Sequence, residues 1–346
     1  MADLGQAIAD VLDLHVGDRG AAGIAVVARP SAPPVAVWVP SSARDEPAYL
    51  IYSITKTFVA VLLLSLSDEG RLALDDPLSR WFPRILPGRP ISLRQLLNHT
   101  AGLPDYGDVA AYHDDQRAAP ARPWRFERFA AETFEKGLRF EPGTGWAYSN
   151  PGYMLLRRVV EEVAGASLAA LIAERIAGSL GLSRTFVPGS VEDLSSLAPA
   201  TSTALALDRS PRDIRRHYHP GWVSHGVVAS TASDVARFFD ALFGGRLVSP
   251  ASLREMTTLV PLPMIPEAHR VESPWGRPGY GLGIMGDQSS RWGRLWGHDG
   301  GGPGYRTSAF HAPDMTGVSV AAMCAVEDDR RAERLAFAAL DVLRGR

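Results

Sequence analysis

Residues 53–72 read SITKTFVAVLLLSLSDEGRL, a long apolar stretch that begins with a serine and a lysine. The apolar body predicts a helix, and Glu69-Gly70 is typical of a helix C-terminus. In a helix, residues three positions apart are separated by about 300° of rotation and about 4.5 Å of rise, so they share a face. Ser53 and Lys56 are therefore expected to lie close to each other at the start of this helix.

This S-x-x-K pattern has a chemical interpretation and a simpler one. A serine hydroxyl becomes a good nucleophile when a base takes its proton, and a lysine can be that base only when it is neutral. Apolar residues 58–60 predict burial that lowers the pKa of Lys56, and the positive end of the helix acts in the same direction. The simpler alternative is a lysine that extends to solvent beside an N-cap serine. Only two lysines, Lys56 and Lys136, occur among 36 basic residues, which favours the chemical interpretation.

Apolar patterning predicts strands at both ends of the chain and helices between them. The strand-like runs are residues 23–28, 35–39, 48–51, 280–285, 294–297, 305–311 and 317–326. The helical patterns between them are residues 92–97, 123–135, 152–163, 167–179 and 233–243. An amphipathic helix is also predicted at each end, the first carrying Leu4, Ile8, Val11 and Leu12 and the second spanning residues 328–343.

These elements indicate an α+β fold with one antiparallel sheet built from both ends of the chain. The N- and C-terminal helices are expected on one face of the sheet and an inserted, mainly helical lobe on the other. The expected division is an α/β lobe of residues 1–52 and 275–346 and a helical lobe of residues 53–274. A cleft between the lobes is the expected active site.

Composition excludes several classes of protein. The 36 basic and 38 acidic residues give a net charge of −2, which offers no electrostatic basis for binding nucleic acid or an anionic membrane. The single cysteine, Cys324, excludes an internal disulfide and a multi-cysteine metal site. The longest apolar run, Phe58–Leu64, is far shorter than the roughly 18 residues of a membrane span. With no basic leader at its start, we expect a cytoplasmic protein, or an exported one if a leader has been removed.

Two further motifs carry candidate chemistry. Tyr148-Ser149-Asn150 lies in a Pro- and Gly-rich loop, where a phenol could relay a proton and the amide could contact a substrate amide; a turn asparagine beside a half-buried tyrosine is the alternative. His298-Asp299-Gly300-Gly301 follows a predicted strand. There, His298 could face the cleft, Gly300 could admit a ligand and the Gly301 N–H could bind an oxyanion. A glycine-rich loop with a surface histidine is the alternative for that motif.

The order S-x-x-K, Y-x-N, H-x-G resembles that of the serine β-lactamase and penicillin-binding protein superfamily. The sequence is most similar to the branch with class C β-lactamases, D-Ala-D-Ala carboxypeptidases, D-aminopeptidases and esterases. The resemblance extends over roughly residues 45–325 and includes the runs LLNHTAGLPDY (96–106), HGVVASTASDVARFF (225–239), GYGLGI (279–284) and GHDGGGPGY (297–305).

The resemblance implies a role for each motif residue, and it implies neither a cofactor nor a metal. It implies that Ser53 is the acylated nucleophile, with Lys56 as its base partner and Tyr148 as proton relay. Which of Lys56 and Tyr148 removes the serine proton stays open. The residues implied to contact the substrate are Asn150 by its amide, His298, Gly300, and Gly301 by a backbone N–H that joins the Ser53 N–H in an oxyanion hole.

Two departures from the family pattern bear on the substrate. A histidine stands where β-lactamases usually have the lysine of K-T-G, and Asp299 replaces a hydroxyl residue, adding negative charge near the cleft. Arg306 could restore a contact to a substrate carboxylate. We therefore expect hydrolysis of small esters or amides, D-amino-acid peptides among them, and weak hydrolysis of β-lactams. The alternatives are a slowly acylating, ligand-sensing protein and, if the protein is exported, a peptidoglycan D-Ala-D-Ala carboxypeptidase; the oligomeric state stays open.

Two other patterns are given structural interpretations. Residues 281–286 match G-x-G-x-x-G, but no helix is predicted after them to hold a pyrophosphate, so we assign them to strand and turn. His217, His219 and His225 have metal-like spacing, yet Pro220-Gly221 intervenes and no carboxylate is well placed, so we do not predict a zinc site.

Overall fold

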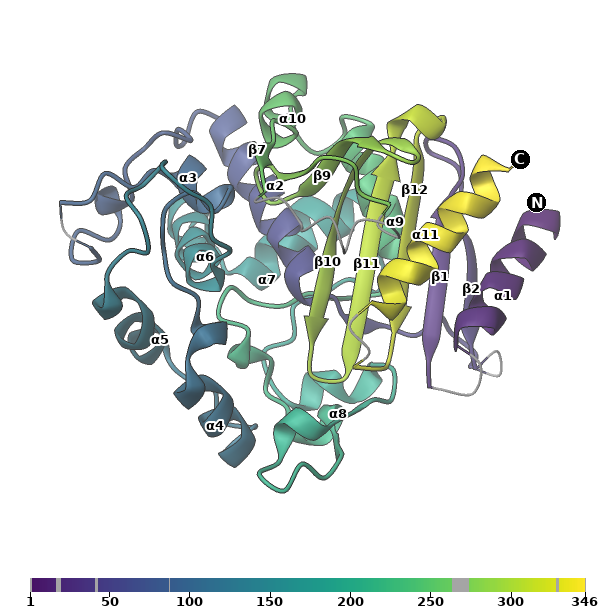
Figure 1. Cartoon of the computed structure of the whole chain (residues 1–346), viewed down its shortest axis with the longest axis horizontal. Helices are drawn as coiled ribbons and strands as arrows, with labels where there is room; N and C mark the ends of the chain where they lie inside the picture. Colours follow the sequence, from purple (N-terminus) through teal and green to yellow (C-terminus); the bar gives the residue numbers. More distant parts are fainter. Residues whose placement is uncertain are drawn as a thin grey trace.

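The computed structural model describes residues 2–16, 20–40, 43–86, 88–262, 274–327 and 330–345. Within them, an antiparallel eight-stranded sheet has the order β2-β1-β12-β11-β10-β9-β8-β7 (Figure 1). Because β1 pairs with both β2 and β12, the two ends of the chain form one sheet, as predicted. The strands are β1 (Ala22–Val27), β2 (Val35–Val39), β7 (Val260–Pro261), β8 (Pro278–Tyr280), β9 (Met285–Ser290), β10 (Gly293–Gly302), β11 (Tyr305–Ala312) and β12 (Val318–Cys324).

Strand β1 shows why the sheet needs a layer on each face. All six of its residues are buried. Ala22, Ile24 and Val26 pack in the core shared with the terminal helices, whereas Ala25 and Val27 belong to the core on the opposite face. Successive side chains of a strand point to opposite faces, so a strand that is apolar at every position is stable only between two layers.

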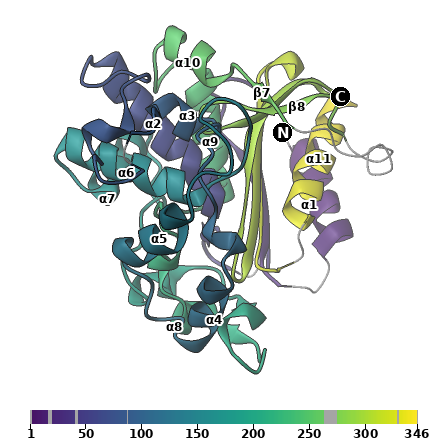
Figure 2. The same cartoon turned by 60° about the vertical axis from the view of Figure 1, so that its left-hand side comes forward.

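Helices cover both faces, as the sequence predicted. The terminal helices α1 (Ala2–Val16) and α11 (Arg331–Arg344) lie side by side on one face (Figures 1 and 2). They bury the apolar stripe of each helix, which in α1 contains Ile8 and Leu12 and in α11 contains Leu335 and Leu340. On the other face, α9 (Ala232–Phe243) packs on β1, β11 and β12.

The helical side is organised around α2 (Thr55–Asp68), which is buried on nearly all sides. Phe58 of α2 stacks on Phe238 of α9 with ring centroids 3.8 Å apart, which joins α2 to the layer that covers the sheet. In the described part of the chain, no helix is both long and apolar enough to span a membrane. The remaining helices are α3 (Leu93–Leu97), α4 (Ala110–Ala118), α5 (Phe126–Thr133), α6 (Asn150–Ala164), α7 (Leu168–Leu171), α8 (Ile214–His217) and α10 (Pro250–Met256).

Several details differ from the sequence predictions. Residues 280–285 are not one strand: they join β8 to β9 through a turn in which Gly281 N–H donates to the Ile284 carbonyl and Gly283 has a φ of 72°. These are the glycines of the G-x-G-x-x-G pattern, and a Cβ on Gly283 would lie 2.5 Å from the Ala60 Cβ. The predicted strand 48–51 forms β3 (Tyr49–Leu50), which pairs with β6 (Ala229–Ser230) outside the main sheet. A second small pair is β4 (Thr201–Ser202) with β5 (Arg212–Asp213).

The stacking of Phe58 on Phe238 generates a prediction about stability. Replacing the fully buried Phe238 by alanine removes a large apolar group and leaves a cavity, so the free energy of unfolding should fall by about 3–5 kcal/mol. Leu14→Ala is the control, because that side chain is 81% exposed and should change stability by less than about 0.5 kcal/mol. Urea denaturation followed by circular dichroism measures both, and equal midpoints for the two variants would contradict this packing.

Candidate active site

Ser53 lies in a short 3-10 turn, Tyr52–Ile54, that leads directly into α2. Two contacts fix the turn: the Ile54 N–H donates to the Ile51 carbonyl (3.1 Å), and the Tyr52 hydroxyl donates to the carbonyl of Pro303 between β10 and β11 (2.5 Å). Tyr52 has a φ of 43°, which is uncommon for a residue with a side chain. The turn holds Ser53 half-buried in the wall of a pocket.

Lys56 is fully buried on the first turn of α2, and its amine contacts three polar atoms. The distances from Lys56 Nζ are 3.1 Å to Ser53 Oγ, 2.7 Å to Asn150 Oδ1 and 3.3 Å to His225 Nε2. Burial lowers the pKa of Lys56 to about 7, against the opposing effect of the Asp105 carboxylate. The expected proximity of Ser53 and Lys56, and the expected direction of the pKa shift, are therefore both found.

Tyr148 reaches Ser53 from a loop that is distant in the sequence. Its hydroxyl donates to Ser53 Oγ over 2.8 Å, and its ring centre lies 4.7 Å from Lys56 Nζ. The loop is held by His99, whose Nδ1 accepts the Ser149 N–H (3.2 Å) and whose ring centroid lies 4.4 Å from that of Tyr148. Burial raises the pKa of Tyr148 well above its usual value, so the phenol is a proton donor at neutral pH.

Asn150 begins α6 and binds protein groups with both ends of its amide. Its Nδ2 donates to both carboxylate oxygens of Asp105 (3.1 and 3.0 Å), and its Oδ1 accepts from Lys56. Because a carboxylate only accepts hydrogen bonds, Asp105 determines which end of the amide faces Lys56. The predicted contact of Asn150 with a substrate amide stays a prediction; the side chain lines the pocket, and in this structure its amide contacts Lys56 and Asp105.

His298 is not exposed to the pocket as the sequence interpretation expected. Strand β10 continues through Gly302, so the H-x-G motif is strand, not loop. The side chain is 2% exposed, with Nε2 2.8 Å from the Tyr280 hydroxyl and Nδ1 2.6 Å from the Asp299 carbonyl oxygen. Burial and the charge of Lys56 lower the pKa of His298 to about 3, so it is neutral and supports Tyr280 behind the site.

The glycines of the same motif differ from each other in role. A Cβ on Gly300 would lie 2.2 Å from the Ile51 carbonyl oxygen and 2.4 Å from Thr307 Oγ1. Gly300 therefore permits β10 to pack against the segment before Ser53, which corrects the expectation that it admits a ligand. Gly301 lines the pocket together with Ser53.

Asp299 does not add charge to the cleft. It alternates with His298 along β10, accepts a hydrogen bond from Ser308 on β11, and is half-buried on the face covered by α11. Burial and the nearby Glu333 raise the pKa of Asp299 to about 7. Arg306 does line the pocket, with its guanidinium donating to the carbonyls of Gly302 (2.8 Å) and Tyr305 (3.0 Å).

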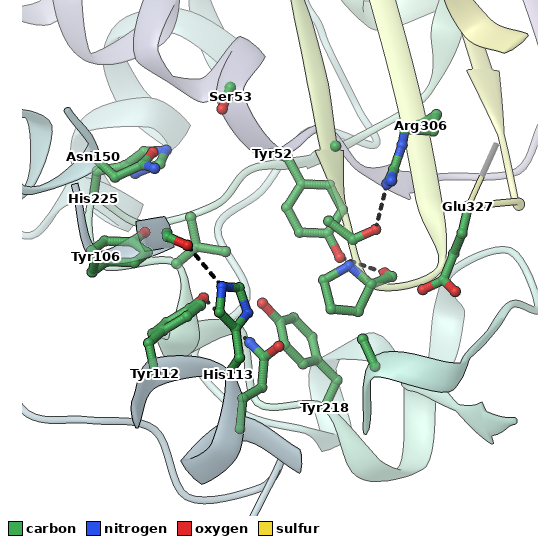
Figure 3. Close-up of a pocket in the computed structure, with 17 residues that line it drawn as sticks. Tyr52, Ser53, Tyr106, Tyr112, His113, Asn150, Tyr218, His225, Arg306 and Glu327 are labelled. Atoms are coloured by element: carbon green, nitrogen blue, oxygen red, sulfur yellow. Dashed lines mark hydrogen bonds between the residues drawn. The ribbon is translucent and has the colours of Figure 1, made fainter. Parts of the chain in front are cut away.

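The pocket beside Ser53 has a volume of about 480 Å³. Figure 3 shows Ser53 at one end of it, with Arg306 and Glu327 on the opposite side from Asn150. Four tyrosines contribute to its walls, which suits an apolar or aromatic group with some polar edges. The tyrosines that line it are Tyr52, Tyr106, Tyr112 and Tyr218.

The sequence did not assign roles to two residues that contact the site, Asp105 and His225. Both lie in runs that carry the family resemblance, LLNHTAGLPDY and HGVVASTASDVARFF, and His225 also stood out by its spacing from His217 and His219. Among the described residues, His225 alone of the three closely spaced histidines contacts Lys56. His217 Nδ1 lies 2.8 Å from the Asp213 carbonyl oxygen, and His219 Nδ1 accepts the Gly221 N–H.

Comparisons with known proteins bear on the same chemistry. A family model described as Beta-lactamase matches residues 8–344. The chain is 30% identical over 281 residues to Penicillin-binding protein 4* of Bacillus subtilis (strain 168), covering 76% of this chain but 58% of that protein, so it spans less than two thirds of that relative. It is also 30% identical over 280 residues to Lovastatin esterase of Penicillium rubens, covering 69% of each chain.

Solved structures have the same fold over nearly the whole chain. A D-stereospecific amidohydrolase from Streptomyces sp. superposes with a TM-score of 0.80 at 29% identity, covering 96% of this chain and 98% of that one. The D-amino acid amidase from Ochrobactrum anthropi SV3, complexed with D-phenylalanine, superposes with a TM-score of 0.82 over 99% of this chain and 100% of that one. At 23% identity, the second likeness shows the fold alone.

The burial of Lys56 can be measured directly, because the chain has only two lysines. In an NMR titration of protein that carries isotope-labelled lysine, Lys56 should titrate with a pKa of about 7. A Lys136→Arg variant leaves one lysine and so assigns the signal. A single transition near the ordinary lysine value of about 10.4 in that variant would contradict the described burial.

Proposed function

The chain belongs to the Beta-lactamase family, and from that premise we propose that it is a serine hydrolase that forms an acyl-enzyme at Ser53. One observation carries the proposal: Ser53 Oγ lies within hydrogen-bond distance of both Lys56 Nζ (3.1 Å) and the Tyr148 hydroxyl (2.8 Å). A nucleophile in contact with two groups that can exchange its proton is the arrangement that covalent catalysis requires.

The pKa directions favour Lys56 as the base in acylation. With a pKa of about 7, Lys56 is substantially neutral at physiological pH and can take the proton of Ser53. Burial raises the pKa of Tyr148, so a phenolate would be the costlier base. In this proposal, Tyr148 donates and relays protons while Lys56 accepts the first one.

The proposed reaction proceeds in two halves. Ser53 Oγ forms a bond to the substrate carbonyl carbon as its proton moves to Lys56 Nζ, and the Ser53 and Gly301 N–H groups bind the resulting oxyanion. Tyr148 then protonates the leaving oxygen or nitrogen, the scissile bond breaks, and the Lys56 ammonium restores the phenolic proton. In the second half, water attacks the acyl carbon and loses its proton to the same groups, which releases the acid and regenerates Ser53.

The pocket supports a small ester or amide as substrate, with D-amino-acid derivatives included. The tyrosines in its walls and its volume of about 480 Å³ suit an acyl or leaving group that carries an aromatic or branched apolar part. Two relatives are a lovastatin esterase and a D-stereospecific amidohydrolase, which supports the same range of substrates. A neutral, buried His298 contributes no positive charge for a β-lactam carboxylate, so we propose weak β-lactam hydrolysis.

The nucleophile is tested with p-nitrophenyl acetate. Ser53→Ala should lower kcat/KM by about 10⁴-fold or more, because the covalent route is lost. Ser65→Ala, on the same helix but away from the pocket, should leave the rate unchanged. Peptide mass spectrometry after a rapid acid quench should locate an acetyl group on Ser53. Full activity of Ser53→Ala would refute the proposal, whereas an adduct that never turns over would identify the slowly acylating alternative.

The assignment of base and relay predicts a pH profile. Lys56 must be neutral to act, so kcat/KM should rise with increasing pH through an apparent pKa of about 7 and then reach a plateau. Tyr148→Phe should lower the plateau by about 10²–10⁴-fold while the rise stays near the same pH, because the relay is removed and the base is kept. Loss of the rise in Tyr148→Phe would instead make the phenol the titrating base.

A further inference from the structure

Three polar atoms surround the amine of Lys56, and one of them, His225 Nε2, accepts a hydrogen bond only in the tautomer that carries its proton on Nδ1. As an ammonium it has three N–H donors, and Ser53 Oγ, Asn150 Oδ1 and His225 Nε2 lie 3.1, 2.7 and 3.3 Å away. As a neutral amine it keeps two N–H groups and gains one lone pair. Only the lone pair can take the proton of Ser53, so its direction decides whether the amine acts as a base.

One of the two remaining N–H groups is assigned by Asn150. Asp105 holds the Nδ2 end of that amide through both carboxylate oxygens, so Oδ1 faces Lys56 and can only accept. The second N–H group must then point at His225 or at Ser53. If it points at Ser53, the lone pair faces away from the nucleophile and the base is blocked.

His225 is well placed to determine the direction of the second N–H group of Lys56. Its side chain is 1% exposed and stands in the pocket wall next to Lys56, and its Nδ1 has no hydrogen-bond partner among the described residues. Burial, together with the charges of Lys56 and Arg157, lowers the pKa of His225 well below its usual value, so the ring is neutral. A neutral imidazole has one accepting and one donating nitrogen.

The other groups that face Lys56 are not able to accept its second N–H. His99 accepts the Ser149 N–H with Nδ1, so its neutral ring carries the proton on Nε2, which has no partner among the described residues and can only donate. His298 uses both ring nitrogens. Tyr148 and Tyr153 present ring faces to the amine, with centroids 4.7 and 5.5 Å from Nζ. Asp105 acts through Asn150. In the described part of the chain, His225 is therefore the neighbour able to bind the second N–H.

We propose that His225 is a positioning residue for acylation: its Nε2 accepts one N–H of Lys56, so that the lone pair of the neutral amine points at Ser53. The inference rests on the proposed serine-hydrolase function and deepens it. It requires the imidazole proton to be on Nδ1. The opposite tautomer would donate from Nε2 into the lone pair and remove the base.

Two substitutions separate this role from simple packing. His225→Phe keeps a buried ring but removes the acceptor, which lowers the pKa of Lys56 because the ammonium loses a partner. The apparent acid dissociation constant of Lys56 should rise about threefold to tenfold, and kcat should fall about 10–100-fold with KM within about threefold. His225→Gln keeps an acceptor and should restore the Lys56 pKa and most of kcat. His217→Phe is the matched control. Because His217 does not contact Lys56, this substitution should change neither the Lys56 pKa nor kcat.

The measurements are the lysine NMR titration and the pH–rate profile with p-nitrophenyl acetate. A His225→Phe enzyme with unchanged Lys56 pKa and kcat would overturn the inference. A His225→Gln enzyme as slow as His225→Phe, with the Lys56 pKa unmoved in both, would also overturn it by showing a packing role. The titration needs no catalysis, so it tests the contact between His225 and Lys56 even if Ser53 is never acylated. Absence of acylation at Ser53 would count against the proposed function alone.

A third measurement does not depend on whether the phenylalanine variant folds. Nitrogen NMR of isotope-labelled histidine in the unmodified protein distinguishes the two tautomers, with His225→Gln used to assign the signal. Above the Lys56 transition, the Nδ1-protonated tautomer of His225 is expected. Finding the proton on Nε2 would overturn the inference.

Discussion

The site depends on the buried amine of Lys56 having hydrogen-bond partners both when it is charged and when it is neutral. Moving an isolated ammonium out of water costs several kcal/mol, and the acceptors around Lys56 together with the nearby Asp105 carboxylate offset part of that cost. The remaining penalty leaves the pKa at about 7, where a proton can be gained or lost with little free energy. Every residue that touches Nζ is constrained by that balance, because a missing acceptor or an added charge would favour one state.

The sheet also fixes the position of Ser53, through contacts from outside the helix that follows it. Strand β10 comes so close to the turn at Ser53 that a Cβ at Gly300 would meet the Ile51 carbonyl and a Cβ at Gly302 would meet the Tyr52 ring. The hydroxyl of Tyr52 closes the same contact through the Pro303 carbonyl. The close approach of β10 to residues 51 and 52 thus explains the glycines at positions 300 and 302. The turn that carries Ser53 is held between α2 and the sheet.

Much of this could be predicted from the sequence, because local patterns carry it. Apolar periodicity located α2 and the terminal helices, and the three-residue spacing placed Lys56 next to Ser53. The roles of Asp105 and His225 could not be predicted, because each depends on a contact with a residue far away in the sequence. Asp105 contacts Asn150, which is 45 positions away, and His225 contacts Lys56, which is 169 positions away. His298 does lie on the face of β10 that packs against the segment before Ser53, the same face as Gly300. Strand alternation could not show that the Tyr280 hydroxyl contacts its imidazole or that the side chain is 2% exposed.

The pairing of β1 with β12 has a consequence for the biosynthesis of the protein. Ala22 is opposite Cys324, so the hairpin of β1 and β2 is translated long before the strand that will pair with its open edge. Contacts between such distant segments form slowly, because a long loop must be closed first. Until β10 to β12 leave the ribosome, the nascent chain exposes an apolar strand edge, and the segment carrying Ser53 lacks the surface against which it packs. The turn at Ser53 therefore reaches its final packing only after β10 to β12 have been synthesised, and until then the edge of β1 must stay unaggregated.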